Sequence, residues 1–187
     1  MEEIDLWQYE RQALAEGHVH ICGCDEAGAG PLAGPVYAAA VILPMGADIP
    51  GLNDSKKLTE KKREATALAW SVASISAQEI DESDILTARM RAMQMAIDGL
   101  SLPADFALID GNRDHGRGGG VNTPHRCIVK GDSLSASIAA ASILAKVSRD
   151  RFMLEMAKEY PQYAFERHKG YGTKLHYERL REYGPSP

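Results

Sequence analysis

The sequence of 187 residues lacks an apolar run long enough to cross a bilayer. The longest such run, Val36 to Leu43, ends at Pro44, whereas a membrane-spanning helix needs about 20 apolar residues. Cysteine is scarce, with three residues and no CxxC pair, which argues against a disulfide framework. The first residues, MEEIDLW, lack the basic and then apolar pattern of a secretory signal. These absences exclude an integral membrane protein, and we expect a protein of the reducing cytoplasm.

The composition lacks any strong bias, with 44% hydrophobic and 25% charged residues, which excludes disordered and fibrous proteins. A chain of this length has room for one domain or for one domain with a small appendage. The net charge of -5 is unevenly placed, because residues 145–187 hold nine Lys and Arg against six Asp and Glu. A basic C-terminal part is compatible with a polyanion partner, and equally with an ordinary solvated helical surface.

Apolar periodicity and turn residues predict alternating strands and helices after an initial group of strands. A glycine-rich segment, residues 113–120, is expected to be a flexible loop. This order indicates an α/β protein with a mixed sheet between helices. The predicted strands cover residues 18–26, 35–44, 72–80, 106–110 and 126–130, and the predicted helices cover residues 6–16, 59–69, 84–100, 135–160 and 175–183.

Four carboxylates follow apolar strands of the predicted sheet. Asp25 and Glu26 close the first strand, Asp110 closes FALID, and Asp132 comes two residues after RCIVK. A carboxylate at such a place is costly unless it binds a cation or a donor. Oxygen ligands favour Mg²⁺ or Mn²⁺, and two such ions about 4 Å apart support phosphodiester hydrolysis. The alternative for each acid is a turn cap or an ion pair with a nearby lysine.

The glycine-rich segment Gly28 to Gly34 does not fit a dinucleotide-binding loop. Its spacing is GxGxxxG, Pro31 interrupts it, and a strand follows it, so no helix N-terminus is offered to a pyrophosphate. Glycines here would let a substrate approach the backbone closely, and the alternative is a tight turn without a ligand.

Four potential zinc ligands alternate along the first predicted strand: His18, His20, Cys22 and Cys24. One tetrahedral ion cannot collect side chains that spread over about 20 Å of strand. We therefore expect the two cysteines to be packed and inert.

Five stretches together make the chain resemble bacterial ribonuclease HII. This resemblance implies a ribonuclease H-like fold, with a five-stranded mixed sheet flanked by helices and a small helical C-terminal part. Residues 1–160 would form the catalytic domain, and residues 161–187 would form a loop and helix packed on it. The stretches are CDEAGAGPLAGPVYAAAVIL, NDSKKL, LIDGNR, VKGDSLSASIAAASILAKVSRDR and HKGYGTKLHYERLREYGPSP.

The resemblance also implies a reaction, a cofactor and a partner. The enzyme would cut on the 5′ side of a ribonucleotide, in RNA/DNA hybrids and in DNA duplexes with embedded ribonucleotides. It would use two divalent ions, Mg²⁺ or Mn²⁺, leave 3′-hydroxyl and 5′-phosphate ends, and act as a monomer.

Site residues follow from the matching motifs. The metal-binding and catalytic carboxylates would be Asp25, Glu26, Asp110 and Asp132. A Gly-Arg-Gly loop that contacts the ribose 2′-hydroxyl falls on Gly28, Ala29 and Gly30, with alanine in place of the family's arginine. Tyr171 would stack on the sugar after the ribonucleotide. The expected phosphate contacts are Lys56, Arg113, Lys146, His168 and Lys169.

Two alternative functions remain open. Ala29 and a C-terminus shorter than is usual in the family are compatible with a nucleic-acid binding protein of the same fold with weakened catalysis. A metal-dependent phosphatase for a small molecule would need the carboxylates but neither the glycine loop nor Tyr171.

Overall fold

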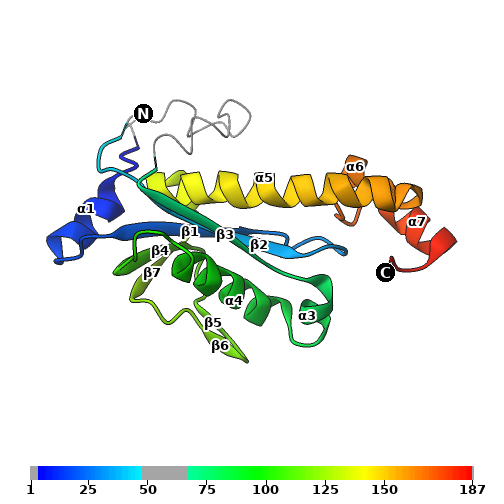
Figure 1. Cartoon of the computed structure of the whole chain (residues 1–187), viewed down its shortest axis with the longest axis horizontal. Helices are drawn as coiled ribbons and strands as arrows, with labels where there is room; N and C mark the ends of the chain where they lie inside the picture. The colour runs from blue at the N-terminus through cyan, green and yellow to red at the C-terminus, as the bar shows by residue number, and fades with distance from the viewer. Residues whose placement is uncertain (1–3, 48–66, 187) are drawn as a thin grey trace.

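A five-stranded sheet forms the centre of the molecule. The computed structural model describes residues 4–47 and 67–186. The strands are β1 (Ile21–Ala27), β2 (Val36–Ile42), β3 (Ala69–Ile75), β4 (Phe106–Asp110) and β7 (His125–Ile128). Their order is β3-β2-β1-β4-β7, in which β2 is antiparallel to β1 and β3, and β4 is parallel to β1 and β7 (Figure 1). This confirms the predicted α/β class with a mixed five-stranded sheet.

Helices cover both faces of this sheet, so the apolar strands are buried on two sides. The long helix α5 (Ala136–Glu159) lies along one face, and α4 (Ile85–Asp98) lies on the other (Figure 1). A short helix, α1 (Gln8–Ala15), packs beside the start of β1. Among the described residues, no helix has the length and apolar character needed to span a membrane.

Helix α5 lies unusually close to β1 because the facing residues are small. A Cβ atom added at Gly23 would lie 2.1 Å from the carbonyl carbon of Ser137, which is a steric overlap with backbone. Buried alanines of α5, including Ala141 and Ala145, pack on Ala39 of β2 in the same way. The alanine-rich first half of α5 therefore fixes the distance between this helix and the strand that carries Asp25.

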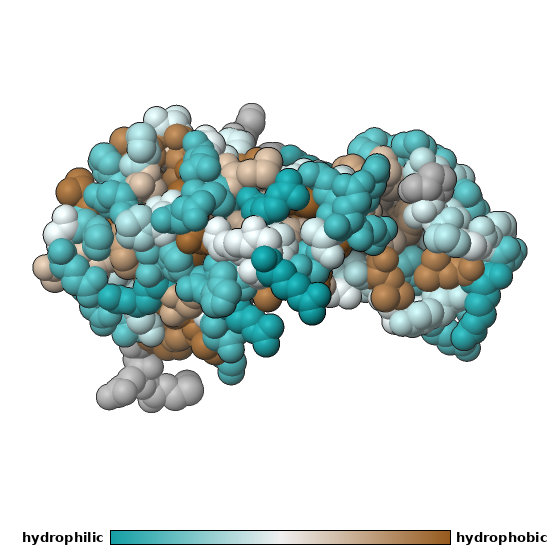
Figure 2. All heavy atoms as spheres, turned by 90° about the horizontal axis from the view of Figure 1, so that it is seen from below, coloured by the Kyte–Doolittle hydropathy of each residue, from teal (hydrophilic) through white to brown (hydrophobic). Residues whose placement is uncertain are grey.

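The C-terminal segment packs on the second half of α5. It contains η2 (Pro161–Tyr163), α6 (Phe165–His168) and α7 (Lys174–Tyr183). Met153 of α5 is buried together with Tyr163 and Phe165, and the phenol and phenyl rings of these two residues stack at 5.4 Å. In the space-filling view, the molecule narrows between the body that holds the sheet and this C-terminal segment (Figure 2).

Two local predictions require correction, and a third lies mostly outside the described residues. The strand expected over residues 72–80 is β3, which ends at Ile75, because Ser76 and Glu79 form a capping box that begins α3 (Ala77–Asp81). The helix expected over residues 59–69 lies mostly outside the described residues, and its last residue, Ala69, begins β3.

The segment expected to be a flexible loop, residues 113–120, contains a small hairpin. Its strands are β5 (His115–Gly116) and β6 (Gly119–Gly120). A Cβ atom at Gly116 would lie 2.6 Å from the hydroxyl oxygen of Thr87, so the hairpin packs directly on α4. The glycines therefore serve close packing, which composition alone does not distinguish from flexibility.

Candidate active site

Two of the predicted carboxylates lie side by side at the ends of parallel strands. Cys24 of β1 pairs with Ile109 of β4, so Asp25 and Asp110, the next residues on the two strands, lie at the same level. Cys24 and Ile109 share the core on the α4 side of the sheet. Because strand side chains alternate between faces, Asp25 and Asp110 point toward the α5 side.

The Asp25 carboxyl is buried and poorly neutralised. Burial is the largest cause that raises its pKa, to about 8, while a hydrogen bond with Ser142 lowers it and the charges of Glu26 and Asp110 raise it. Its Oδ1 accepts a hydrogen bond from the backbone N–H of Glu26 at 2.7 Å. At neutral pH the metal-free protein therefore favours a protonated Asp25, because the fold alone does not stabilise the charge.

Glu26 points to the other side of the sheet end, where α4 supplies a cation. Arg89 Nη2 lies 2.5 Å from Glu26 Oε1, with both side chains mostly buried. Burial nevertheless raises the pKa of Glu26, against the opposing effect of Arg89. Glu26 Oε2 is buried and has no hydrogen-bond partner among the described residues. Arg89 was not predicted as a site residue, because nothing in the sequence of α4 distinguishes it from a surface arginine.

Asp110 and Asp132 form the outer part of the cluster. Asp110 Oδ1 accepts a hydrogen bond from the N–H of Gly131 at 2.6 Å. Lys130 has a positive φ of 58°, and this left-handed residue begins the 3₁₀ turn η1 (Gly131–Ser133) that presents Asp132. Burial raises the pKa of Asp110, the backbone N–H groups of Asp132 and Gly131 lower it, and the Asp132 charge raises it.

The four carboxylates fit a site for divalent cations. Asp25, Glu26 and Asp110 are coupled electrostatically, and the exposed Asp132 is coupled to Asp110. A buried carboxylate oxygen without a donor and several raised pKa values are costly in the protein alone, and a bound cation would remove both costs. Oxygen-only ligands of this kind suit Mg²⁺ or Mn²⁺.

The glycine loop and the Tyr171 loop come together on the α5 side of the molecule. The backbone N–H of Leu32 donates to the carbonyl oxygen of Gly170 at 2.9 Å. Gly30 is exposed, and a Cβ atom there would lie 3.8 Å from the Tyr171 ring, which is 46% exposed. Gly28 has a φ of +108°, a conformation that favours glycine, and Ala29 is half-buried between the two glycines.

A buried arginine that sequence analysis missed, Arg149, holds these two loops in place. Its guanidinium donates to the carbonyl oxygens of Pro35 at 3.0 Å, Ala33 at 3.0 Å and Lys169 at 2.9 Å. The guanidinium carbon also lies 5.7 Å from the centre of the Tyr171 ring. The side chain is only 1% exposed, so it acts as a positioning residue for the loops. Its place in the charged stretch SRDR gave no signal of this role.

The predicted basic contacts fall into different environments. Lys56 lies outside the described residues. Arg113 is exposed on the segment after β4, and Lys146 is exposed on α5, 3.5 Å from Asp150. Lys169 is half-buried, and its Nζ lies 2.5 Å from the carbonyl oxygen of Glu166.

His168 has an environment unlike that of the other predicted contacts. It is buried, its Nε2 lies 2.9 Å from the carbonyl oxygen of Tyr163, and its Nδ1 accepts from the N–H of Gly170 at 3.2 Å. Its ring also stacks on His176 at 4.4 Å. Because both ring nitrogens are bonded to the backbone, we assign His168 a role in positioning the Tyr171 loop in place of the expected phosphate contact.

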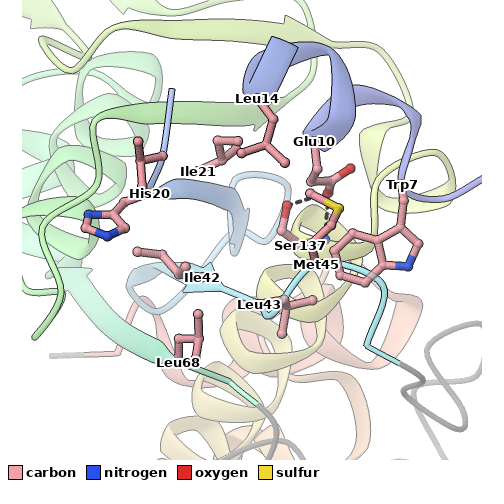
Figure 3. A pocket seen from close by; sticks show the side chains of 11 residues that line it. Trp7, Glu10, Leu14, His20, Ile21, Ile42, Leu43, Met45, Leu68 and Ser137 are labelled. Carbon is pink, nitrogen blue, oxygen red and sulfur yellow. Dashed lines mark hydrogen bonds between the residues drawn. The ribbon is translucent and has the colours of Figure 1, made fainter. Parts of the chain in front are cut away.

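The cysteines of β1 and the pocket near its start lie apart from the carboxylates. Cys22 and Cys24 are fully buried, and burial raises the pKa of Cys22 to about 12, so these thiols are packed as expected. A pocket of about 120 Å³ lies at the start of β1, opposite the end that carries Asp25, between α1 and the end of β2 (Figure 3). Its lining includes Trp7, Ile42 and Leu68 and none of the four carboxylates.

Comparison with known proteins gives consistent matches. The model of the family described as Ribonuclease HII matches residues 22–187. The chain is 50% identical to ribonuclease HII of Geobacillus sp. (strain WCH70), over 96% of this chain and 66% of that protein. It is 49% identical to ribonuclease HII of Caldicellulosiruptor bescii, over 98% of this chain and 91% of that protein. Among solved structures, it is similar to ribonuclease H2 from Pyrococcus horikoshii OT3, with a TM-score of 0.70, 25% identity and 90% of each chain covered.

Proposed function

Because the chain belongs to the ribonuclease HII family, we propose that it hydrolyses the phosphodiester bond on the 5′ side of a ribonucleotide. Members of this family are metal-dependent endoribonucleases of the ribonuclease H type, and this chain is such an enzyme. The proposed substrates are RNA/DNA hybrids and DNA duplexes with embedded ribonucleotides, and the proposed products carry 3′-hydroxyl and 5′-phosphate ends. We propose that it acts as a monomer in the cytoplasm, where its free thiols would remain reduced.

The observation that carries this proposal is the cluster of under-neutralised carboxylates at the end of β1 and β4. Asp25, Glu26, Asp110 and Asp132 would hold two divalent ions, Mg²⁺ or Mn²⁺. When bound, such ions activate water and stabilise the leaving oxygen of a phosphodiester. Arg89 contacts Glu26 Oε1, and the buried Oε2, which has no hydrogen-bond partner among the described residues, would be the oxygen that binds a cation.

The loops joined by Arg149 supply the substrate-binding part of the proposal. We propose that a ribose 2′-hydroxyl bonds to the backbone of the Gly28–Gly30 loop, in which Gly30 is exposed and Ala29 is half-buried, and the exposed Tyr171 ring lies beside Gly30. This pairing of a backbone surface with an exposed ring suits recognition of a sugar, because the 2′-hydroxyl both donates and accepts hydrogen bonds. The small-molecule phosphatase does not explain why the fold joins these two loops.

One assay tests the proposed function. The protein is incubated with Mg²⁺ or Mn²⁺ and a labelled DNA duplex that carries a single ribonucleotide. A nick on the 5′ side of that ribonucleotide supports the proposal. Binding without cleavage would favour the nucleic-acid binding alternative, and neither binding nor cleavage would contradict both.

We expect Tyr171→Ala to reduce cleavage strongly while changing stability little. Loss of the ring that packs on the sugar should lower the rate roughly tenfold to a hundredfold, which corresponds to about 1.4–2.8 kcal/mol. Tyr183 on α7, 47% exposed, offers a matched control, Tyr183→Ala. Cleavage rates and thermal unfolding are measured for both variants. A large loss of stability with unchanged turnover per folded molecule would show that Tyr171 only packs its loop.

We expect Ala29→Arg to improve cleavage or binding by roughly tenfold to a hundredfold. A charge-assisted contact to a phosphate is worth about 1.5–3 kcal/mol, and about 1.4 kcal/mol corresponds to tenfold. The 5′ preference should persist in both proteins, because Gly28 and Gly30 are unchanged. The variant should also lose affinity more steeply as salt rises, since it makes one more phosphate contact. Equal rates and equal salt slopes would place residue 29 away from the nucleic acid.

A further inference from the structure

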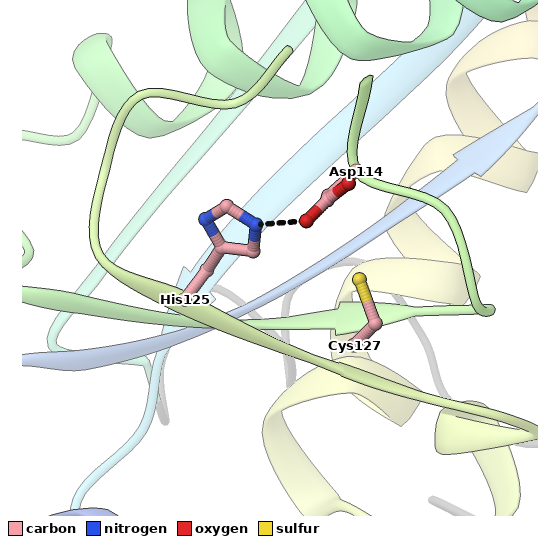
Figure 4. Close-up of side chains that lie close together, drawn as sticks. All are labelled: Asp114, His125 and Cys127. Atoms are coloured by element: carbon pink, nitrogen blue, oxygen red, sulfur yellow. Dashed lines mark hydrogen bonds and ion pairs between the residues drawn. The ribbon is translucent and has the colours of Figure 1, made fainter. Parts of the chain in front are cut away.

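A second group of possible metal ligands lies on the opposite face of the sheet from Asp110. A carboxylate oxygen of Asp114, a ring nitrogen of His125 and the sulfur of Cys127 all lie within 4.8 Å of one another (Figure 4). His125 and Cys127 alternate on β7, so their side chains share a face, and Asp114 comes from the segment after β4. Cys127 packs against the core on the α4 side, whereas Asp110 points toward α5. The sheet therefore separates this group from Asp25 and Asp110.

The hydrogen bonds of His125 indicate which ring nitrogen is free to bind a cation. Nδ1 lies 2.6 Å from the carbonyl oxygen of Thr123, which only accepts, so Nδ1 carries the hydrogen. A neutral ring then presents the lone pair of Nε2 to Asp114 Oδ2, which lies 3.1 Å away. Two acceptors at this distance require a proton or a metal ion between them. A backbone carbonyl on the other ring nitrogen is also the usual arrangement around a metal-binding histidine.

The backbone around this group is held in place by further contacts. The N–H of Val121 donates to the carbonyl oxygen of Asp114 at 2.9 Å, which closes the segment that carries the β5–β6 hairpin. Gln94 of α4 accepts from the N–H of Asn122 at 2.7 Å, just before His125. Asp114 and His125 thus stand at the two ends of a segment whose geometry is fixed without an ion.

We propose that Asp114, His125 and Cys127 bind a zinc ion, with water as the fourth ligand. A thiolate and an imidazole favour Zn²⁺ over the Mg²⁺ that suits an oxygen-only site. Zinc–ligand bonds of about 2.0–2.3 Å require the ligand atoms to approach by roughly 1 Å from the widest separation in the structure. Binding replaces the proton of the Cys127 thiol, which is released to solvent, and joins the edge strand β7 to the segment after Asp110.

The thiol of Cys127 provides a direct readout of this site. Cys22 and Cys24 are fully buried, whereas Cys127 is partly exposed, so alkylation followed by mass spectrometry reports on Cys127 selectively. Zinc alone is the probe, and the protein carries Asp25→Asn to weaken metal binding at the catalytic carboxylates. We expect saturating zinc to slow alkylation of Cys127 by at least about tenfold. Alkylation at the same rate with and without zinc would overturn the proposal.

Variants separate a zinc site from a simple His125–Asp114 ion pair. His125→Ala should weaken zinc binding, measured by competition with a zinc-sensitive dye, by at least about a hundredfold. His115→Ala is the matched control, because His115 is exposed and lies 2.5 Å from the other oxygen of Asp114. The His115→Ala substitution should leave the zinc affinity within a few-fold of that of the Asp25→Asn protein. If the Asp25→Asn protein binds zinc equally well with and without the His125→Ala substitution, the assignment of His125 as a ligand is contradicted.

The absorption spectrum of bound Co²⁺ tests independently whether Cys127 is a ligand, and it requires no substitution of a histidine. Co²⁺ bound by a cysteine thiolate produces a near-ultraviolet charge-transfer band that carboxylate-bound Co²⁺ does not produce. We expect this band in the parent and its loss in Cys127→Ser. Absence of the band in the folded parent at saturating Co²⁺ would overturn the participation of Cys127. Neither result depends on nuclease activity, so the zinc site and the proposed function fail separately.

Discussion

Replacing Asp25 with asparagine is expected to abolish cleavage and, at high pH without metal, to stabilise the protein. The change removes one charge with almost no change in volume. Loss of a metal ligand should cost several kcal/mol of transition-state stabilisation, or roughly a thousandfold or more in rate. The two effects have opposite signs because the same buried charge serves metal binding and opposes folding.

The pH dependence of the free energy of unfolding distinguishes the removal of the Asp25 charge from a general structural effect of the substitution. Asp25 has a folded pKa of about 8, above its ordinary value of 3.8. Its protonation therefore stabilises the metal-free fold fully below about pH 4, and this stabilisation is lost as pH rises to about 8. Asp25→Asn lacks this dependence, so its advantage over the wild type should grow with pH in that window, by at most about 1.4 kcal/mol per pH unit.

Chemical denaturation of the metal-free proteins across pH measures the effect, with Asp81→Asn as an exposed control that should match the wild type. Adding Mg²⁺ at high pH should stabilise the wild type more than Asp25→Asn. A folded Asp25→Asn protein that still cleaves at a near-normal rate would remove Asp25 from the metal site.

Arg149→Met is expected to damage both stability and cleavage. Methionine fills much of the volume of the arginine stem but leaves three carbonyl oxygens without their charged donor. Removing such a buried donor should lower the free energy of unfolding by about 3–5 kcal/mol. Arg149 would then no longer hold the Gly28–Gly30 loop and the Tyr171 loop at a fixed distance from each other. A misplacement of about 1 Å can lower the rate roughly a hundredfold.

Separate measurements of stability and of kinetics test this role. Arg167→Met replaces an exposed arginine on α6 and should change neither property appreciably. If Arg149 positions the substrate-binding loops, single-turnover cleavage of folded Arg149→Met should fall and its KM should rise. Loss of stability with normal kinetics for the folded fraction would limit Arg149 to a structural role.

Elements with a strong local signal were predictable from the sequence. The buried run of β2, the mixed three- and four-residue spacing of α4 and the alanine-rich α5 each identify their element without tertiary information. The end of β3 was not predicted, because the capping box of Ser76 and Glu79 overrides an apolar run that continues to Ile80. The β5–β6 hairpin was missed because its glycines are selected by contact with Thr87.

The residues of the candidate site also differ in whether the local sequence predicts them. Carboxylates at strand ends carry a local signal, because an acid that follows an apolar run is costly unless it binds a cation or a donor. Arg89 and Arg149 carry none, because their roles depend on groups distant in sequence: Arg89 contacts Glu26, and Arg149 contacts Ala33 and Pro35. Asp114, His125 and Cys127 come together only through the return of the chain from β4 to β7.

The parallel pairing of β1 with β4 also determines when the protein becomes active during folding. The hairpin contacts of β1 with β2 are local, whereas Ile21 pairs with Phe106 across much of the chain. Such long-range pairing has a larger entropic cost of closure and forms more slowly than local contacts. Asp25 follows the paired residues on β1 and Asp110 follows them on β4, so the two carboxylates come together only when these strands pair. A nascent or partly folded chain therefore has an incomplete carboxylate cluster, and nuclease activity should begin only when the sheet is fully assembled.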